Sequence, residues 1–215
     1  MSNALQYSKK TSGMIFVITL SALMAVTSLS TDIYLPAMPL MAKGLRGNAE
    51  LTITGFLIGF CLAQLIWGPV SDRFGRRLPL FIGMGLFVIG SMGCALSTDI
   101  GQIIFWRVFQ ALGACTGPML ARAMIRDLFS RTRAAQMLST LMIIMAIAPI
   151  AGPLIGGQMI KVTSWHAIFW LLAIIGALML MSLFWLPETL PAEKRSQTSV
   201  TKAFKNYFAL LTNTR

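Results

Sequence analysis

The sequence predicts an all-α membrane protein whose six transmembrane helices form one bundle. The chain of 215 residues is 56% hydrophobic and only 12% charged, and its mean hydropathy of +0.72 is too high for a soluble globular domain. Six apolar stretches approach or exceed the roughly 20 residues that a helix needs to cross about 30 Å of hydrocarbon. Because unpaired backbone groups are costly in lipid, and no barrel-like alternation is present, each stretch is expected to be an α-helix.

The expected spans divide the chain into three parts. They cover residues 14–35, 51–70, 78–96, 101–121, 135–160 and 167–186, so that a cytoplasmic N-terminus (1–13) precedes the bundle (14–186) and a cytoplasmic tail (187–215) follows it. From Val200 onward, apolar residues recur with helical spacing, which predicts an amphipathic helix on the membrane surface. A solvated tail that folds only against a partner is the alternative.

The basic residues predict the orientation of the bundle. Lys and Arg number 18 against seven acids, and most of them flank the spans on the side that also holds both termini. Because cytoplasmic loops carry the excess of Lys and Arg, we expect both termini in the cytoplasm. The charges fall only in short gaps, which argues against a nucleic-acid partner. The three cysteines lie inside apolar runs without metal-ligand spacing, so no metal and no cofactor are expected.

Two ionisable side chains fall inside the spans. Asp32 lies near the outer end of the first span, and Arg107 lies near the outer end of the fourth. Burial of such groups in lipid is expensive, so they are functional candidates by default. If the two helices are neighbours, Arg107 could hold Asp32 as a carboxylate, and protonation of Asp32 would release the pair. The alternatives are that Asp32 caps its helix end in outside water and that Arg107 extends to the outer headgroups.

The short segment 68–77 is expected to latch the cytoplasmic side of the bundle. Its two glycines permit a sharp reversal, its aspartate can sit at a helix N-terminus, and its arginines can bind facing carboxylates or lipid phosphates. An aspartate in the next cytoplasmic loop is a natural partner for Arg76 or Arg77. An ordinary basic loop is the alternative. The residues of this predicted latch are Gly68, Asp72, Arg73, Gly75, Arg76, Arg77 and Asp127.

The fifth span contains a motif of prolines and glycines. Pro149 and Pro153 remove backbone hydrogen bonds and are expected to bend the helix. Gly152, Gly156 and Gly157 provide a surface without side chains, against which another helix can close tightly. We interpret the motif as a hinge and a seal.

Several motifs together resemble the major facilitator superfamily, and within it the drug:proton antiporters of the bicyclomycin-resistance (Bcr/CflA) family. The resemblance covers nearly the whole chain, and it implies the first six helices of that fold, a role for Arg107 in proton transfer, and an antiporter motif in the fifth helix. Ala111 and Ala148 stand where the family patterns usually have glycine. The matching segments are 31–39, 68–77, 104–114, 152–157, 164–170 and 187–190.

The resemblance implies proton-coupled efflux of small amphipathic drugs, with protons and the lipid bilayer as further partners. Tyr34 and Gln110 are the polar groups near the predicted switch that could line a substrate cavity. Members of the superfamily have two six-helix halves, so this chain is expected to need a second half; as alternatives it is a truncation, a split gene product, or a half that pairs with its own copy. A non-transporting half is the second hypothesis. No enzyme is expected, because the only histidine, His166, lies in an outer loop.

Overall fold

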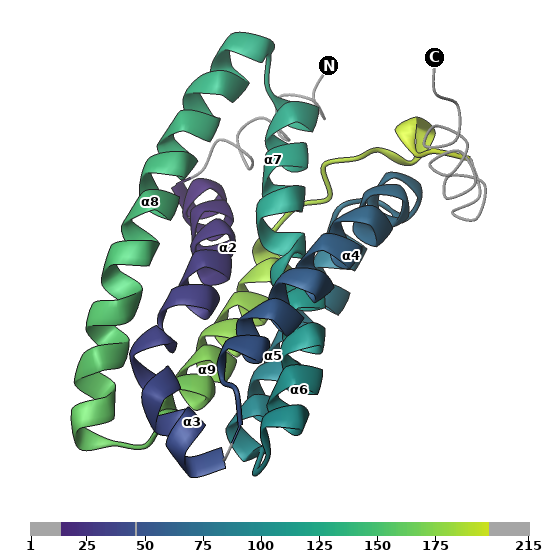
Figure 1. The fold of residues 1–215 in the computed structure, drawn as a ribbon. Helices are drawn as coiled ribbons and strands as arrows, with labels where there is room; N and C mark the ends of the chain where they lie inside the picture. Colours follow the sequence, from purple (N-terminus) through teal and green to yellow (C-terminus); the bar gives the residue numbers. More distant parts are fainter. Residues whose placement is uncertain (1–13, 46, 198–215) are drawn as a thin grey trace, which may run out of the picture.

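The computed structural model describes residues 14–45 and 47–197, and this part of the chain is helical without β-strands. Six of its stretches are long and apolar enough to cross a membrane, which confirms the predicted fold class (Figure 1). The predicted N-terminal segment 1–13 and the amphipathic helix from Val200 lie outside the described residues. The six stretches are Ile15–Leu45, Glu50–Phe74, Arg77–Leu96, Ile100–Leu128, Arg131–Val162 and Trp165–Trp185.

Two of the six spans are built from more than one α-helix, and the last span ends in a short 3-10 turn. The elements in order are α2 (Met14–Asp32), η1 (Leu35–Ala37), α3 (Met38–Leu45), α4 (Glu50–Phe74), α5 (Arg77–Leu96), α6 (Ile100–Ala114), α7 (Thr116–Leu128), α8 (Arg131–Val162), α9 (Trp165–Ser182), η2 (Leu183–Trp185) and η3 (Ala192–Lys194).

The first span is broken where two prolines follow each other closely, and it extends beyond the predicted end at residue 35. Helix α2 ends at Asp32, and Pro36 lies in η1. Pro39 sits in the first turn of α3, where a missing N–H removes no intrahelical hydrogen bond. The chain therefore resumes a helical path instead of leaving the bundle at the prolines.

The fourth span is also divided, because α6 and α7 meet at Cys115. The side chain of Asp99 begins α6 by accepting a hydrogen bond from the N–H of Gly101 at 2.6 Å. At the other end α7 runs to Leu128, well past the predicted end at residue 121. The apolar count missed this last part because Arg122 and Arg126 interrupt it, although exposed basic side chains are compatible with a helix that leaves the membrane.

The reversal between the second and third spans occurs at Gly75. This glycine has φ of 95°, a conformation that other residues adopt only at a cost. Two predictions for this segment were wrong: Gly68 lies inside α4 and does not form the reversal, and Asp72 lies in the last turn of α4 and not at a helix N-terminus. Helix α4 continues through polar residues beyond the apolar stretch, since its last turn no longer has to face lipid.

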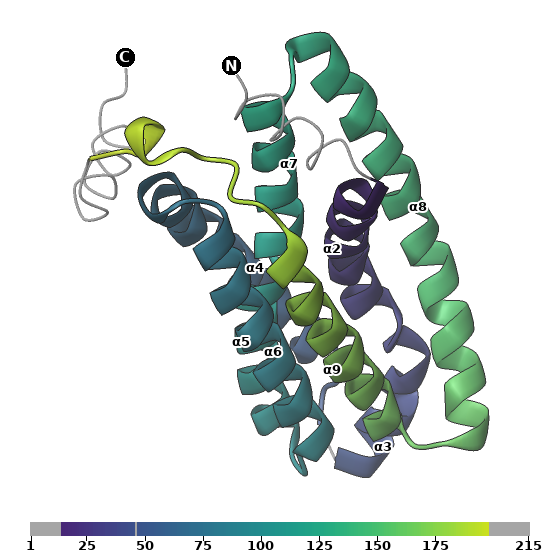
Figure 2. The ribbon, with the colours of Figure 1, turned by 180° about the vertical axis from the view of Figure 1, so that it is seen from behind.

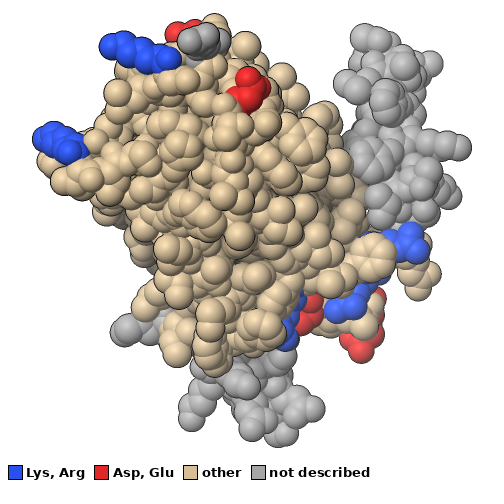
Figure 3. Space-filling model, turned by 90° about the horizontal axis from the view of Figure 1, so that it is seen from below, with Lys and Arg blue, Asp and Glu red and all other residues tan. Residues whose placement is uncertain are grey.

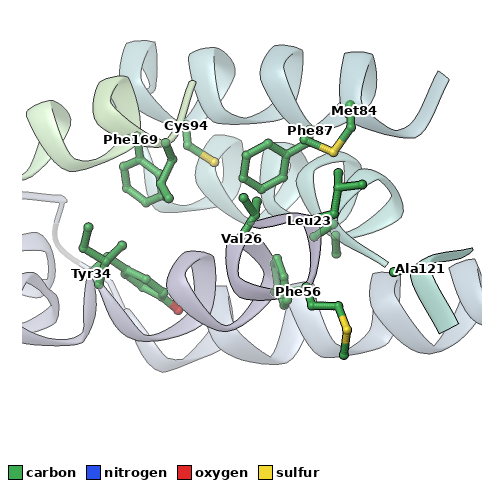
Figure 4. Close-up of a cluster of buried hydrophobic side chains, with 14 of the residues drawn as sticks. Leu23, Val26, Tyr34, Phe56, Met84, Phe87, Cys94, Ala121 and Phe169 are labelled. Atoms are coloured by element: carbon green, nitrogen blue, oxygen red, sulfur yellow. The ribbon is translucent and has the colours of Figure 1, made fainter. Parts of the chain in front are cut away.

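Two groups of helices make up the bundle (Figures 1 and 2). Helix α2 packs against α7 and α8, while α5 packs between α6 and α9, and α6 packs against α4. Most of their buried apolar side chains join in one main core, with Leu23 and Val26 of α2, Phe56 of α4, Phe87 of α5 and Phe169 of α9 close together (Figure 4).

The outer surface of the bundle is apolar. On α8, the side chains Ile143, Ile147, Ile150 and Leu154 are all more than half exposed. Such a surface is unfavourable in water but suits lipid tails or another apolar bundle. Figure 3 views the bundle from the end that carries α3, and most of the surface in view is uncharged. The chain is a multi-pass membrane protein.

Candidate functional site

Arg107 lies at the centre of the bundle and is fully buried. Its side chain is 0% exposed. The Nη1 atom donates to the carbonyl oxygen of Ser30 at 3.0 Å and to Oε1 of Gln110 at 2.7 Å. The alternative prediction, in which Arg107 extends to the outer headgroups, is therefore wrong for this structure.

The contact with Ser30 gives Arg107 a structural role at the end of α2. Ser30 is in the last turn of this helix, where carbonyl oxygens have no intrahelical donor. A cation at this position also interacts favourably with the helix dipole. Arg107 on α6 thus caps α2 and fixes the position of its last turn.

Aromatic rings cover much of the remaining guanidinium surface. The Arg107 Cζ atom lies 4.0 Å from the ring centroid of Tyr34, 4.7 Å from that of Phe56 and 5.8 Å from that of Phe169. Cation–π attraction at buried sites can reach about 2 kcal/mol or more. The rings come from three separate parts of the chain, so the cation connects the two groups of helices.

A hydrogen-bonded chain runs from Arg107 into α5. Gln110 accepts from Arg107 through Oε1 and donates through Nε2 to Oγ of Ser91 at 2.7 Å; Ser91 in turn donates to the carbonyl oxygen of Phe87 at 2.7 Å. All three polar side chains are fully buried. The predicted substrate-cavity residues Tyr34 and Gln110 are both 0% exposed, so in this conformation they belong to the core around Arg107.

The guanidinium keeps donors that no described residue accepts. Nε and Nη2 of Arg107 are buried and have no hydrogen-bond partner within residues 14–45 and 47–197. Within the same residues the ion pairs involve other groups, and Asp32 is in none of them. The expected direct pair of Asp32 with Arg107 is absent from this conformation.

Helix geometry explains why the pair does not form. Residues two positions apart on a helix point about 200° apart. Asp32 lies against Gly152 of α8, whereas the ring of Tyr34, two residues further along the chain, lies against Arg107, so the two side chains point to different neighbours. The sequence reasoning counted depth along the helix and did not include this rotation.

Asp32 instead lies against the glycine motif of α8. A Cβ atom placed on Gly152 would be 3.2 Å from Cβ of Asp32, and one placed on Gly156 would collide with the carbonyl oxygen of Ile33. These two glycines therefore let α8 approach the end of α2 closely. Gly157 differs, because a Cβ placed on it would meet no atom within 4 Å, and its predicted place on the close-packed surface is wrong.

The two prolines of this motif do not interrupt α8. Pro149 and Pro153 both lie inside one continuous helix from Arg131 to Val162. The missing N–H groups still remove backbone hydrogen bonds there, which lowers the cost of bending. A hinge at this point stays a prediction.

Arg76 is the centre of a polar cluster at the α4–α5 turn. Its Nε lies 2.9 Å from Oδ2 of Asp127, and its Nη1 lies 2.6 Å from Oδ1 of Asp72 and 2.8 Å from Oγ of Ser71. Partial burial lowers the pKa of Arg76, but hydrogen bonds to Asp127 and Asp72 outweigh this effect and leave the pKa above its ordinary value. The expected contact of Arg76 with Asp127 is present.

The other two arginines of the predicted latch make different contacts. The Cζ atom of Arg73 lies 5.6 Å from the ring centroid of Phe74. Arg77 donates from Nη2 to the carbonyl oxygen of Phe184 at 3.0 Å, in the 3-10 turn that ends the last span. Arg77 therefore connects the α4–α5 turn to the end of the bundle's last helix.

Glu188 is a member of this cluster that the sequence reasoning missed. Its Oε1 accepts from the N–H of Arg76 at 2.9 Å and its Oε2 from the N–H of Arg77 at 3.1 Å, so it caps the N-terminus of α5 from a distant segment. A signal was available in the sequence. The N-cap residue Arg76 and the first residue Arg77 of α5 are both arginines and supply no side-chain cap, whereas a helix N-terminus favours a carboxylate. Among the described residues, no group of three or more His, Cys, Asp or Glu could hold a metal ion.

Comparison with known proteins agrees with the fold and the motifs. The family model "Major Facilitator Superfamily" matches residues 20–215. The chain is 41% identical over 189 residues to the uncharacterized MFS-type transporter YdgK of Bacillus subtilis, a match that covers 85% of this chain and 47% of that protein. It is 32% identical to a bicyclomycin resistance protein homolog of Haemophilus influenzae, with coverage of 91% and 50%.

A solved structure supports the same assignment of the fold. The xylose transporter XylE of E. coli, in a partially occluded inward-open conformation, matches with a TM-score of 0.73 at 17% identity, over 91% of this chain and 56% of that one. The chain spans about half the length of the curated relatives it matches. It belongs to the Major Facilitator Superfamily.

Proposed function

We propose that this chain is the N-terminal half of a proton-coupled exporter of small amphipathic drugs in a bacterial inner membrane. The bicyclomycin resistance homolog among its relatives supports drug export as the class of transport. The polar cluster around Arg76 and most basic side chains of the described residues lie at one end of the bundle, and the excess of Lys and Arg on cytoplasmic loops places this end, with both termini, in the cytoplasm. Protons move inward through this half as the drug moves outward.

One observation supports proton coupling more than any other: a fully buried arginine with spare donors and, among the described residues, no carboxylate partner. A buried charge that only stabilised the fold would be expected in an ion pair. Arg107 has two unpartnered nitrogen atoms, so it can accept a new partner when the helices move. Water or a carboxylate that enters this space would complete its hydrogen bonds.

Asp32 is the proton carrier in this proposal, and α2 connects it to Arg107. Asp32 faces Gly152 on α8, while the carbonyl oxygen of Ser30, two residues earlier, accepts a hydrogen bond from Arg107. Gain or loss of a proton changes the charge of Asp32. It therefore changes how strongly the contact surface between α2 and α8 attracts water. A shift of α8 along α2 would then rotate the last turn of α2. This rotation would strain the hydrogen bond between Arg107 and the carbonyl oxygen of Ser30.

The cluster around Arg76 is the cytoplasmic latch in this proposal. It joins the α4–α5 turn to α7 through Asp127 and to the segment after the last span through Glu188. Charge-assisted hydrogen bonds of this kind are stronger than neutral ones. Opening of the cytoplasmic side would therefore require these hydrogen bonds to break.

The second candidate function is a half that does not transport alone and requires a complementary six-helix half. The length comparison favours it, since the relatives are about twice as long as the matched region. The exposed apolar side chains of the bundle would be covered by that partner where they do not face lipid.

Transport by vesicles tests whether this chain transports alone and whether a transporter that contains it is proton-coupled. Membrane vesicles that contain this chain alone, or this chain with a complementary C-terminal half, are energised with a pH gradient, and a fluorescent dye reports proton movement on addition of drug. We expect a drug-dependent signal only when both halves are present. Its absence from vesicles in which both halves are inserted would contradict proton-coupled export.

Variants of Arg107 test the role of the buried cation in the same assay. Arg107→Ala removes the charge and is expected to abolish the coupled signal. Arg107→Lys keeps the charge but loses the planar guanidinium that packs against the rings of Tyr34 and Phe56, so partial activity is expected. Full activity of Arg107→Ala would exclude Arg107 from proton transfer.

A further inference from the structure

A cavity beside the polar cluster has the character of an anion site that the transport mechanism does not use. It measures about 370 Å³ and lies between the last turn of α7 and the segment that follows the last span. Arg126, Asp127 and Leu128 line one side of it, and the other side is formed by Thr189, Leu190, Pro191 and Lys194.

Both cations of this cavity are available to a ligand. Arg126 and Lys194 are exposed, and within the described part of the chain no hydrogen bond or ion pair involves either side chain. The one carboxylate of the lining, Asp127, is already paired with Arg76 at 2.9 Å. The cavity therefore presents two positive charges, and the carboxylate in its lining is already paired.

Thr189 supplies an independent sign of a missing ligand. It is 3% exposed, and its Oγ1 has no hydrogen-bond partner among the described residues. Buried hydroxyl groups without a partner are rare because their desolvation is not compensated. An oxygen atom of a ligand in this cavity would accept the hydrogen bond that Thr189 can donate.

We propose that this cavity binds a phosphate group, from either an anionic lipid headgroup or a soluble phosphate. A phosphate oxygen accepts from Thr189, and the two cations bind the remaining oxygens through charge-assisted hydrogen bonds. Leu128 and Leu190 provide an apolar edge beside them, and the site lies where α7 leaves the membrane. A bound phosphate group joins α7 to the segment 189–194 and stabilises the cluster around Arg76.

The test measures the thermal unfolding midpoint of the purified 215-residue chain in a neutral detergent, followed by tryptophan fluorescence. Dioctanoyl-phosphatidylglycerol is compared with dioctanoylglycerol, which lacks the phosphate. Inorganic phosphate is compared with chloride at equal ionic strength. We expect stabilisation by a phosphate compound and none by dioctanoylglycerol or chloride. Response to the lipid alone identifies a headgroup as the ligand, whereas response to inorganic phosphate identifies a soluble phosphate; response to neither overturns the proposal.

Two substitutions locate the effect in this cavity. Arg126→Gln is expected to weaken the apparent affinity for the active phosphate compound about tenfold or more, since a hydrogen bond to a charged group is lost. Arg131→Gln is the matched control, because Arg131 is exposed near the same end of the bundle and does not line the cavity. Equal weakening by both substitutions would mean general charge attraction and would overturn the proposal.

Thr189→Val gives a result that a purely structural role would not give. Without ligand, the variant is expected to be as stable as the unsubstituted chain or more so, because it removes a buried hydroxyl without a partner. Its response to the phosphate compound is expected to fall about tenfold in apparent affinity. An unchanged response in a folded Thr189→Val variant would overturn the proposal.

Discussion

The close approach of α8 to α2 predicts opposite effects for two adjacent glycines. In Gly156→Ala the new methyl group would overlap the carbonyl oxygen of Ile33, which belongs to the backbone and has no rotamer that avoids it. Overpacking of this kind costs about 1–3 kcal/mol, and alanine returns about 0.5–1 kcal/mol through its better helix propensity. We expect a net loss of about 1–2 kcal/mol.

Gly157→Ala is the matched control, since the same methyl group meets no atom within 4 Å. Only the helix-propensity gain of about 0.5–1 kcal/mol remains, so this variant should be slightly more stable. With about 2–4 °C per kcal/mol for a chain of this size, the thermal midpoints of the two variants should lie on opposite sides of the wild-type value. Equal midpoints would refute the close packing of Gly156 against Ile33.

Three further substitutions test the polar contacts by the same thermal measurement. Glu188→Gln weakens the cap of α5 and should cost about 1–2 kcal/mol, whereas the exposed Glu193→Gln should leave the midpoint unchanged; similar loss in both would exclude the cap. Gly75→Ala places a side chain at φ of 95° and within 2.6 Å of the Glu188 carboxylate, so a loss of about 2 kcal/mol is expected, and a neutral effect would contradict the turn geometry. Ser91→Ala leaves the buried Nε2 of Gln110 without its acceptor and should cost about 1–3 kcal/mol; an unchanged midpoint would argue against the hydrogen-bonded chain.

Hydropathy was sufficient to predict the fold class, because the apolar length needed to cross a bilayer leaves a strong signal in the sequence. It did not predict where the helices end. The last turn of α4 and the end of α7 are polar, and α3 has one proline just before it and another in its first turn, so none of them resembles the centre of a span. The positions of helix ends depend on capping groups and on neighbours outside the apolar core.

The candidate site could be predicted as residues but not as contacts. Arg107 stood out because it is charged inside a span, yet its partners Ser30, Gln110 and Tyr34 follow from the rotation of two helices about their axes. Asp32 was placed at the correct end of the bundle and on the wrong side of α2 for a direct pair. Glu188 was missed because its contacts cross more than a hundred positions of sequence.

Drug-dependent proton movement in the Asp32→Asn variant tests the central claim most directly. The variant half is co-expressed with a complementary half, and the dye signal in energised vesicles is compared with that of Asp99→Asn. Asp99 is an acid at the same end of the bundle, outside the spans, and asparagine keeps its capping ability. The proposal predicts that Asp32→Asn inserts normally and gives no drug-dependent signal, while Asp99→Asn retains the signal. A full signal from Asp32→Asn would contradict the account.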